Sequence, residues 1–141
     1  MFECLIIYIH KDEVDLFLKR SNNFLEAAQE RFEKQDWDLT CFFSEQAIQL
    51  YLKASLLELG GEFPRSHSIR TLFANLSQFS EKKIEYDRKS LRFIEDSYFN
   101  ARYLDYKYDK EDALDALNIV NKLKKIIDQV RKDFRNREEK K

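Results

Sequence analysis

The stretch from Trp37 to Leu59 most constrains the fold, because it contains neither glycine nor proline and is apolar on two sides. One apolar stripe recurs at alternating steps of four and three residues, the period of one helix face, and comprises Phe43, Ala47, Leu50, Ala54 and Leu57. A second stripe lies roughly opposite and comprises Ile48, Leu52, Leu56 and Leu59. Between the stripes lie Gln46, Gln49 and Lys53. A helix with only one polar edge is typical of the centre of a helical protein.

Composition favours helices in the rest of the chain as well. The chain has 141 residues but only two glycines and one proline, which argues against a β-rich fold. A chain of this length is expected to form one domain and to bury a core without disulfides or metal. Apolar residues make up 43% and charged residues 36%, which indicates a soluble globular protein. The net charge of -1 provides no general attraction to nucleic acid, so such binding would need a local patch.

The apolar periodicity predicts four further helices. The expected set is a first helix from near Asp12 or Asp15 to Lys34–Gln35, the central helix, a short helix from Ile69 to Leu76, a fourth helix from about Asp87 to about Tyr103, and a last helix ending near Phe134. The first connection is short, so the first two helices should pack antiparallel as a hairpin. The predicted fold is all-α: an antiparallel four-helix up-and-down bundle with an additional short helix.

Capping residues mark the expected helix ends. Candidate N-terminal caps, which accept a backbone hydrogen bond through a side-chain oxygen, are Asp36 or Asp38, Ser66 or Ser68, and Asp109. Gly60–Gly61 is expected to end the central helix, because glycine readily adopts the left-handed backbone of a helix C-terminus. Pro64 then prevents the helix from resuming at once.

The chain is predicted to comprise an N-terminal extension (1–13), a helical bundle (14–134) and a frayed tail (135–141). The segment from Phe2 to Ile9 is apolar, but it includes Glu3 and is too short to span a bilayer. It lacks a basic n-region and a small-residue cleavage site, so we expect no signal peptide. The extension is expected to be strand-like or helical and to pack on the body or on a neighbouring subunit.

Cys4 and Cys41 are the only cysteines, and no CxxC motif is present. Together with two histidines at unrelated spacings they do not form a zinc signature. Two free thiols in a reducing cytoplasm are the favoured interpretation. We therefore expect a cytoplasmic protein with no metal or other cofactor.

Three short elements follow one another along the chain: QAIQLYLKASL at 46–56, PRSHS at 64–68 and YFNARYL at 98–104. Together they resemble the HEPN family (higher eukaryotes and prokaryotes nucleotide-binding domain), whose members show patterns similar to QAxxxxLKAxL, PRTHS and YxxARYP. The resemblance extends from about Val14 to Phe134. No single element is specific for this family, but the occurrence of all three in this order is.

The resemblance implies a helical binding module for a nucleotide or RNA phosphate. It also implies a homodimer and a separate minimal nucleotidyltransferase as partner, in a toxin–antitoxin-like pair. The two-sided apolar helix agrees with a dimer, since one stripe could face a second copy. The binding residues expected from the resemblance and from the residue types are Lys53, His67, Tyr98, Arg102 and Tyr103.

Two departures from the family pattern bear on catalysis. Leu104 replaces the family's proline, and the positions where many HEPN ribonucleases carry histidine hold Lys107, Tyr108 and Asp109. Without an imidazole at these positions, there is no obvious group with a near-neutral pKa there to move the 2′-hydroxyl proton of RNA. We therefore expect a protein that is not catalytic by itself. The alternative is a metal-independent ribonuclease in which Tyr106 or another group replaces the histidine and Arg102 stabilises the phosphorane.

Each binding candidate also has a structural interpretation. Lys53 can extend its ammonium to water over buried methylenes, and His67 can satisfy backbone groups where a helix begins. Arg102 follows Tyr98 by four residues and so shares the core-facing side of the fourth helix. It can offer a guanidinium fork to a phosphate, or form a buried salt bridge with a carboxylate such as Asp105 or Glu95.

Two further alternatives remain, one for the role of the tyrosines and one for the function of the whole protein. Tyr98, Tyr103, Tyr106 and Tyr108 can stack on bases or pack beside the core. A third hypothesis is a helical scaffold or dimerisation protein with no small ligand, in which Arg102 has a purely structural role.

Overall fold

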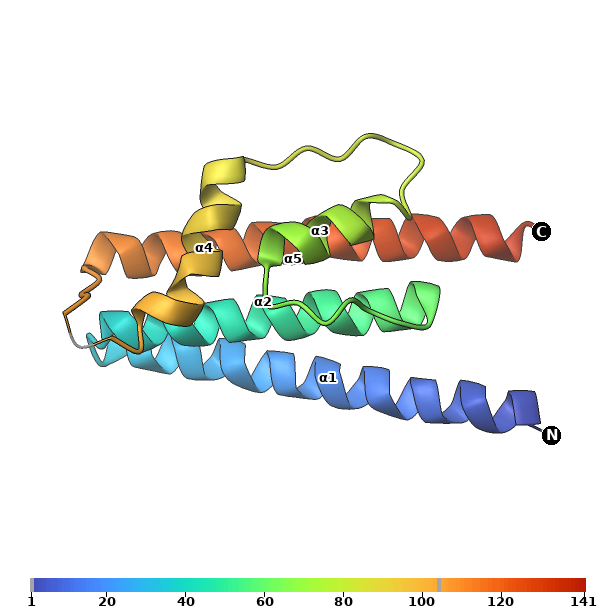
Figure 1. Ribbon diagram of the computed structural model, residues 1–141, viewed down its shortest axis with the longest axis horizontal. Helices are drawn as coiled ribbons and strands as arrows, with labels where there is room; N and C mark the ends of the chain where they lie inside the picture. Colours follow the sequence, from blue (N-terminus) through green and yellow to red (C-terminus); the bar gives the residue numbers. More distant parts are fainter. Residues whose placement is uncertain (1, 104) are drawn as a thin grey trace.

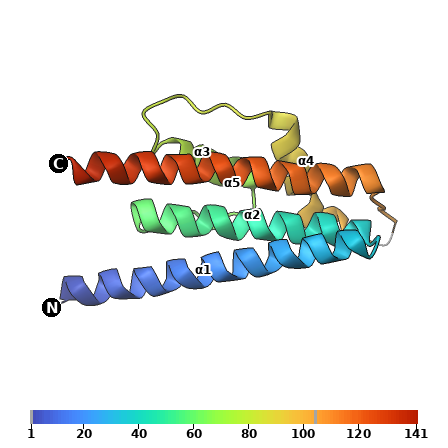
Figure 2. The same ribbon diagram turned by 180° about the vertical axis from the view of Figure 1, so that it is seen from behind.

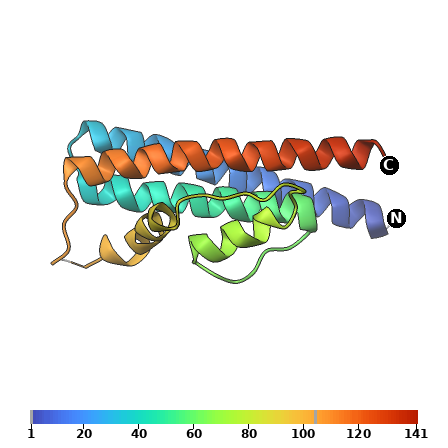
Figure 3. The same ribbon diagram turned by 90° about the horizontal axis from the view of Figure 1, so that it is seen from above.

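The computed structural model describes residues 2–103 and 105–141, with side chains from His10 onward, and this part of the chain forms five α-helices and no strand (Figure 1). The helices are α1 (Phe2–Glu33), α2 (Trp37–Gly60), α3 (Ile69–Ser77), α4 (Arg88–Asn100) and α5 (Lys110–Glu139). The long helices α1, α2 and α5 lie side by side, and the shorter α3 and α4 lie on one side of them (Figures 1 and 3). The all-α prediction is confirmed.

The directions of the long helices follow from the path of the chain (Figures 1 and 2). α1 and α2 run in opposite directions, as the short connection predicts. The segment between α2 and α5 carries α3 and α4 and returns the chain to the end where α2 begins, so α5 runs in the same direction as α2. The order of directions therefore differs from a strict up-and-down alternation.

The helix ends confirm most of the predicted capping residues. Asp36 caps α2 by accepting a hydrogen bond from the Leu39 amide, and Ser68 caps α3. Asp109 caps α5 in a reciprocal capping box with Asp112. Gly61 ends α2 with a left-handed φ of 80°, and its amide donates to the Leu57 carbonyl over 2.9 Å.

α2 is the centre of the core, as its two apolar stripes predict. Ile48, Leu52 and Ala54 have no exposed surface. α1 packs along one side of α2, while α5, α3 and α4 cover the others (Figure 3). Most residues of both stripes are buried within one chain, whereas Phe43, Leu50 and Leu59 are half-buried.

α1 begins at Phe2, so the predicted start near Asp12 or Asp15 is wrong. No glycine or proline interrupts residues 2–15, and nothing local therefore ends the helix before Asp12. Residues 2–13, expected as an extension, form helical turns continuous with α1. The side chain of Cys4 lies outside the described residues, and whether 1–13 is a separate unit stays a prediction.

The C-terminal tail is helical up to Glu139, although fraying was predicted from residue 135. Long-range contacts hold its turns in place. Arg135 pairs with Glu58 of α2 at 2.8 Å, and Arg137 pairs with Glu81 at 3.3 Å and also donates to the Phe79 carbonyl. These contacts join the last turns of α5 to α2 and to the segment after α3.

Among the residues that the structure describes, no helix has the length and apolar character needed to cross a membrane. Cys41 is a free thiol with no exposed surface, and burial raises its pKa far above the ordinary value. Because the thiolate is the reactive form, this thiol is chemically inert.

Candidate functional site

The candidate site is built on the polar edge of α2, where side chains four residues apart share one face. Gln49 joins its two neighbours there: its Nε2 donates to Glu45 Oε1 over 2.6 Å, and its Oε1 accepts from Lys53 Nζ over 3.1 Å. The Phe63 ring lies beside Lys53, with its centroid 5.6 Å from Nζ. Burial lowers the pKa of Lys53, and the nearby carboxylate of Glu45 opposes that shift.

His67 joins this row from the loop between α2 and α3. Its Nδ1 lies 3.4 Å from Gln49 Oε1, and its ring stacks on Tyr98 of α4 with centroids 4.6 Å apart and planes 16° apart. Ser68 caps α3 immediately after His67, which fixes the backbone at this point. The imidazole therefore bridges α2 and α4 and does not merely satisfy the start of α3.

Arg102 lies beyond the end of α4, in a turn where its amide donates to the Phe99 carbonyl over 3.1 Å. The expected core-facing position on the fourth helix is wrong, because α4 ends at Asn100. The side chain is exposed, and its guanidinium carbon lies 4.0 Å from the Tyr98 ring centroid and 5.8 Å from that of Phe42. These are cation–π contacts that hold the group at the surface.

Glu95, one of the two carboxylates proposed as salt-bridge partners of Arg102, is engaged elsewhere. Glu95 pairs with Arg70 at 2.8 Å and accepts a hydrogen bond from Ser68 Oγ over 2.6 Å. Within the described ranges, no carboxylate forms an ion pair with Arg102. Its guanidinium donors are therefore available to a molecule from outside.

Glu45 is the residue that sequence reasoning missed. It has no exposed surface, and it accepts hydrogen bonds from Gln46 Nε2 over 2.8 Å and from Gln49 Nε2 over 2.6 Å. Burial raises its pKa to about 7, although both hydrogen bonds and the charges of Lys53 and Arg102 oppose the shift. Its position four residues before Gln49, on the same edge as Lys53, was the available signal.

The row thus runs from Glu45 through Gln49 to Lys53 and His67, and through Tyr98 to Arg102.

A family model for the HEPN domain matches residues 14–131 of the chain. The chain belongs to the HEPN domain family.

Two solved structures share the fold of this HEPN domain. The crystal structure of TT1696 from Thermus thermophilus matches with a TM-score of 0.70 and 21% identity, covering 83% of this chain and 97% of that one. The archaeal HEPN homologue ST0689 matches with a TM-score of 0.59 and 22% identity, covering 86% of this chain and 97% of that one. No curated protein matches the chain. At these identities, the two structures bear on the fold alone.

Tyr103, the fifth predicted residue, is not part of the row in this HEPN domain. It is 60% exposed. Phe99 (54%) and Tyr106 (44%) are exposed as well, and we call these three aromatic residues, which are close in sequence around the end of α4, the aromatic rim. The Tyr98 ring, by contrast, already contacts His67 and Arg102.

Two of the three positions considered for the missing histidine, Tyr108 and Asp109, have structural roles. Tyr108 is 5% exposed, and its amide donates to Asp38 over 2.7 Å, so it packs and does not stack on bases. Asp109 caps α5. Of the three positions, Lys107 alone has an exposed side chain with no role in a helix end.

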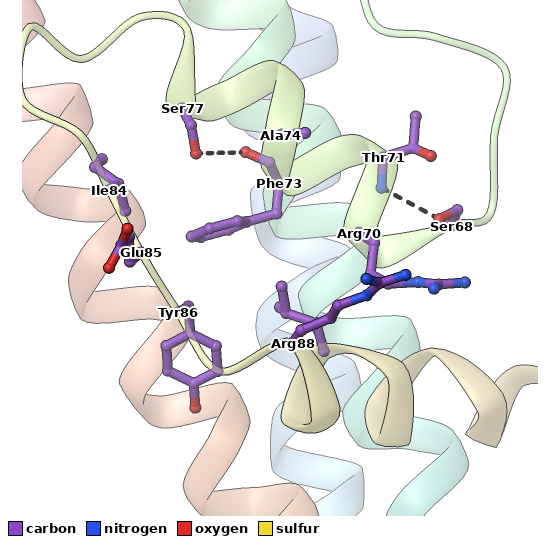
Figure 4. A pocket seen from close by; sticks show the side chains of 11 residues that line it. Ser68, Arg70, Thr71, Phe73, Ala74, Ser77, Ile84, Glu85, Tyr86 and Arg88 are labelled. Carbon is purple, nitrogen blue, oxygen red and sulfur yellow. Dashed lines mark hydrogen bonds between the residues drawn. The ribbon is translucent and has the colours of Figure 1, made fainter.

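A separate hollow of about 860 Å³ lies between α3, the segment after it and the start of α4 (Figure 4). Phe73 points into it from α3, across from Ile84 and Tyr86. None of the five predicted site residues lines this hollow, and Arg70 at its edge is paired with Glu95. We therefore place the candidate site at the row that begins on the polar edge of α2. Charged groups and groups with shifted pKa values occur together there.

Among the described side chains, no group of three or more His, Cys, Asp or Glu residues is placed to hold a metal ion. The chemistry available at the row is that of two cations, an imidazole, a buried carboxyl and stacked aromatic rings. Such a set suits the recognition of an anion.

Proposed function

We propose that this HEPN domain binds the phosphate of a nucleotide or of RNA at the row on α2, with Arg102 and Lys53 as the cationic ligands. The observation that carries the proposal is the exposed Arg102 guanidinium, which is stacked on Tyr98 at 4.0 Å and unpaired with any carboxylate in the described ranges. A planar guanidinium with free donors matches the geometry of phosphate oxygens. His67 and the aromatic rim supply further contacts for a sugar or a base.

The open position of the row favours a phosphate group that is part of a larger molecule. Arg102 and His67 are both exposed, so their polar atoms can reach a ligand without a change in the fold. Stacking on Tyr98 restricts the guanidinium before the ligand arrives, which lowers the entropy lost on binding. We place the aromatic rim around the base and Arg102 on the phosphate.

The test is the affinity for a panel of nucleotides and for a dinucleotide with one phosphodiester, measured by calorimetry. Arg102→Ala and Lys53→Ala are each expected to weaken binding about tenfold or more, the usual effect of removing a charged hydrogen-bond donor. Lys125→Ala, on the exposed surface of α5, is the matched control and should bind as the wild type does. Equal affinities of wild type and Arg102→Ala would contradict the proposal.

The scaffold hypothesis makes a different prediction for Arg102→Ala, and it concerns the melting temperature. If Arg102 is structural, Arg102→Ala lowers the melting temperature. Its exposed position beyond α4 predicts that the melting temperature changes little while binding is lost.

The ribonuclease alternative rests on Tyr106, which is 44% exposed and four residues after Arg102. A phenol is a weaker proton acceptor than an imidazole at neutral pH, and Glu45 is fully buried. We therefore favour binding without cleavage. An RNA-cleavage assay with wild type and Arg102→Ala separates the two, because cleavage by the wild type alone would establish the enzyme.

A homodimer and a separate minimal nucleotidyltransferase, in a toxin–antitoxin-like pair, complete the proposal. Membership of the HEPN family supports the pairing. The aromatic rim also supports it, because exposed aromatic groups beside a polar site are typical of protein interfaces.

A further inference from the structure

The phosphate-binding proposal does not use Glu45, although this residue belongs to the same row. Its carboxyl group has no exposed surface and is enclosed by hydrogen bonds from Gln46 and Gln49. It therefore cannot touch a ligand from outside. The Gln49 side chain joins it to Lys53, because Gln49 donates to Glu45 over 2.6 Å and accepts from Lys53 Nζ over 3.1 Å. The charges of Lys53 and Arg102, the two proposed anion ligands, favour its ionised form.

We infer that anion binding by Arg102 and Lys53 is coupled to protonation of Glu45, so that the site takes up protons from solution as the anion binds. The inference rests on the proposed function. It adds a second occupant of the site, a proton on a buried carboxyl, and it predicts how the affinity for an anion depends on pH.

The coupling follows from the charges in the row. Lys53 and Arg102 carry two positive charges, and ionised Glu45 offsets one of them. An arriving anion competes for the same two cations and weakens the attraction that keeps Glu45 ionised. Protonated Glu45 leaves both cations to the anion. Burial already brings the two forms of Glu45 close in free energy, because it raises the pKa of the carboxyl to about 7.

The surroundings of Glu45 leave few other groups that could produce this effect. The charged groups that act on it most strongly are Lys53 from α2 and Arg102 from the turn after α4, and none of the strongest effects comes from α1, α3 or α5. His67, from the loop before α3, reaches Glu45 through the Gln49 side chain. Because histidines generally change charge near neutral pH, His67 needs a control of its own.

Linkage sets the size of the expected effect. The factor by which protonation of Glu45 strengthens anion binding equals the factor by which the anion favours protonation. Couplings between two sites commonly amount to roughly tenfold. With the pKa of free Glu45 about 7, the affinity should thus fall about fivefold between pH 6 and pH 8, with about half a proton taken up per anion near pH 7.5.

The experiment is calorimetry with two probes that do not themselves titrate between pH 6 and pH 8: inorganic sulfate, and a dinucleotide without terminal phosphates. Repeating each titration in buffers of different ionisation enthalpy measures the proton uptake. Glu45→Gln should bind both probes at pH 8 about as tightly as the wild type does at pH 6, with no uptake. Glu26→Gln, which removes an exposed carboxylate from α1, is the matched control and should keep the wild-type pH dependence.

The outcomes separate this inference from the function on which it rests. Binding with the same pH dependence in Glu45→Gln and in the wild type would overturn the coupling and leave the anion site intact. Absence of binding of both probes to the wild type would overturn the proposed function and the coupling with it. A response to the dinucleotide but not to sulfate identifies a phosphodiester as the preferred anion, and the coupling is then decided with the dinucleotide.

Two further measurements distinguish Glu45 from His67 as the group whose protonation is coupled to anion binding. His67→Phe keeps a ring against Tyr98 but removes the imidazole, and its remaining affinity should still fall with rising pH if Glu45 is the coupled group. If that variant loses the pH dependence, the coupling belongs to His67 and the inference is wrong. Carboxyl-carbon NMR of Glu45 should show its titration midpoint moving to higher pH when sulfate is added.

Discussion

At the scale of the residue, Glu45 makes the folded state depend on pH in an unusual direction. Burial raises its pKa from 4.5 to about 7 in the folded protein. The folded state therefore binds a proton that the unfolded state has already released, and this contribution to stability falls as the pH rises from about 4.5 to about 7. A carboxylate whose pKa is lowered by a salt bridge has the opposite effect, because its contribution to stability rises with pH.

Glu45→Gln should remove this dependence, because glutamine has a similar shape and no ionisable proton. The variant is expected to be more stable than the wild type by about 2–3 kcal/mol at pH 8 and to show little difference at pH 5. Urea denaturation at both pH values measures the difference in the free energy of unfolding. A difference that is the same at pH 5 and pH 8 would show that Glu45 does not titrate between them.

The sequence indicated four residues of the row but not the carboxyl beneath them. Lys53, His67, Tyr98 and Arg102 stand in short elements that could be compared with a family pattern. Glu45 lies on the polar edge of α2, and the edge alone does not show that it is buried. Its burial depends on tertiary packing, which helix periodicity does not encode.

The orientation of Arg102 was missed for a different reason. The fourth helix ends at Asn100 without a glycine or proline, and Leu104 replaces the family's proline. No local signal therefore placed the helix end before Arg102, and the periodicity was extended too far. Its stacking on Tyr98 becomes evident only when the turn after α4 is seen.

At the scale of the element, helix ends with a capping residue were predicted well, and ends that depend on distant contacts were not. Asp36, Ser68, Asp109 and Gly61 are local signals with a direct physical role. The last turns of α5 instead depend on Glu58, which lies on α2 and pairs with Arg131 at 2.7 Å and Arg135 at 2.8 Å. Sequence periodicity carries no information about such a pairing.

Glu58→Gln should therefore loosen the C-terminal turns of α5. The Arg131 side chain is 12% exposed, and the loss of its carboxylate partner should cost about 1–3 kcal/mol. Amide hydrogen exchange is expected to accelerate over 131–139 more than over 115–125, with a lower urea midpoint. Glu62→Gln, in the exposed loop after α2, is the control. Equal exchange rates in Glu58→Gln and wild type would show that the tail is helical without this contact.

At the scale of the whole molecule, the burial of α2 limits where partners can bind. Most of both apolar stripes of α2 is covered within the chain, which leaves only the half-buried Phe43, Leu50 and Leu59 partly accessible to a second copy or to another protein. Large apolar side chains that remain exposed in the described part of the chain are Leu16, Phe99, Tyr103, Tyr106 and Leu114. Three of these five form the aromatic rim, whose members precede and follow Arg102 in the sequence. A nucleotidyltransferase that docks on the rim would therefore also cover the anion site.

This arrangement predicts competition between the partner and the ligand. Phe99→Ser combined with Tyr103→Ser should abolish co-purification with the proposed nucleotidyltransferase, because the two side chains are 54% and 60% exposed and belong to the rim. Leu16→Ser, on α1, is the matched control and should leave the complex intact, since Leu16 is 42% exposed but lies on another helix. In the wild type, a dinucleotide bound at Arg102 should weaken the complex. If the double variant still binds the nucleotidyltransferase, or if saturating dinucleotide leaves the complex unchanged, the partner uses a surface other than the rim.

Light scattering of the double variant tests the proposed homodimer separately. A mass of twice 17.1 kDa retained in that variant would place the contact between copies away from Phe99 and Tyr103.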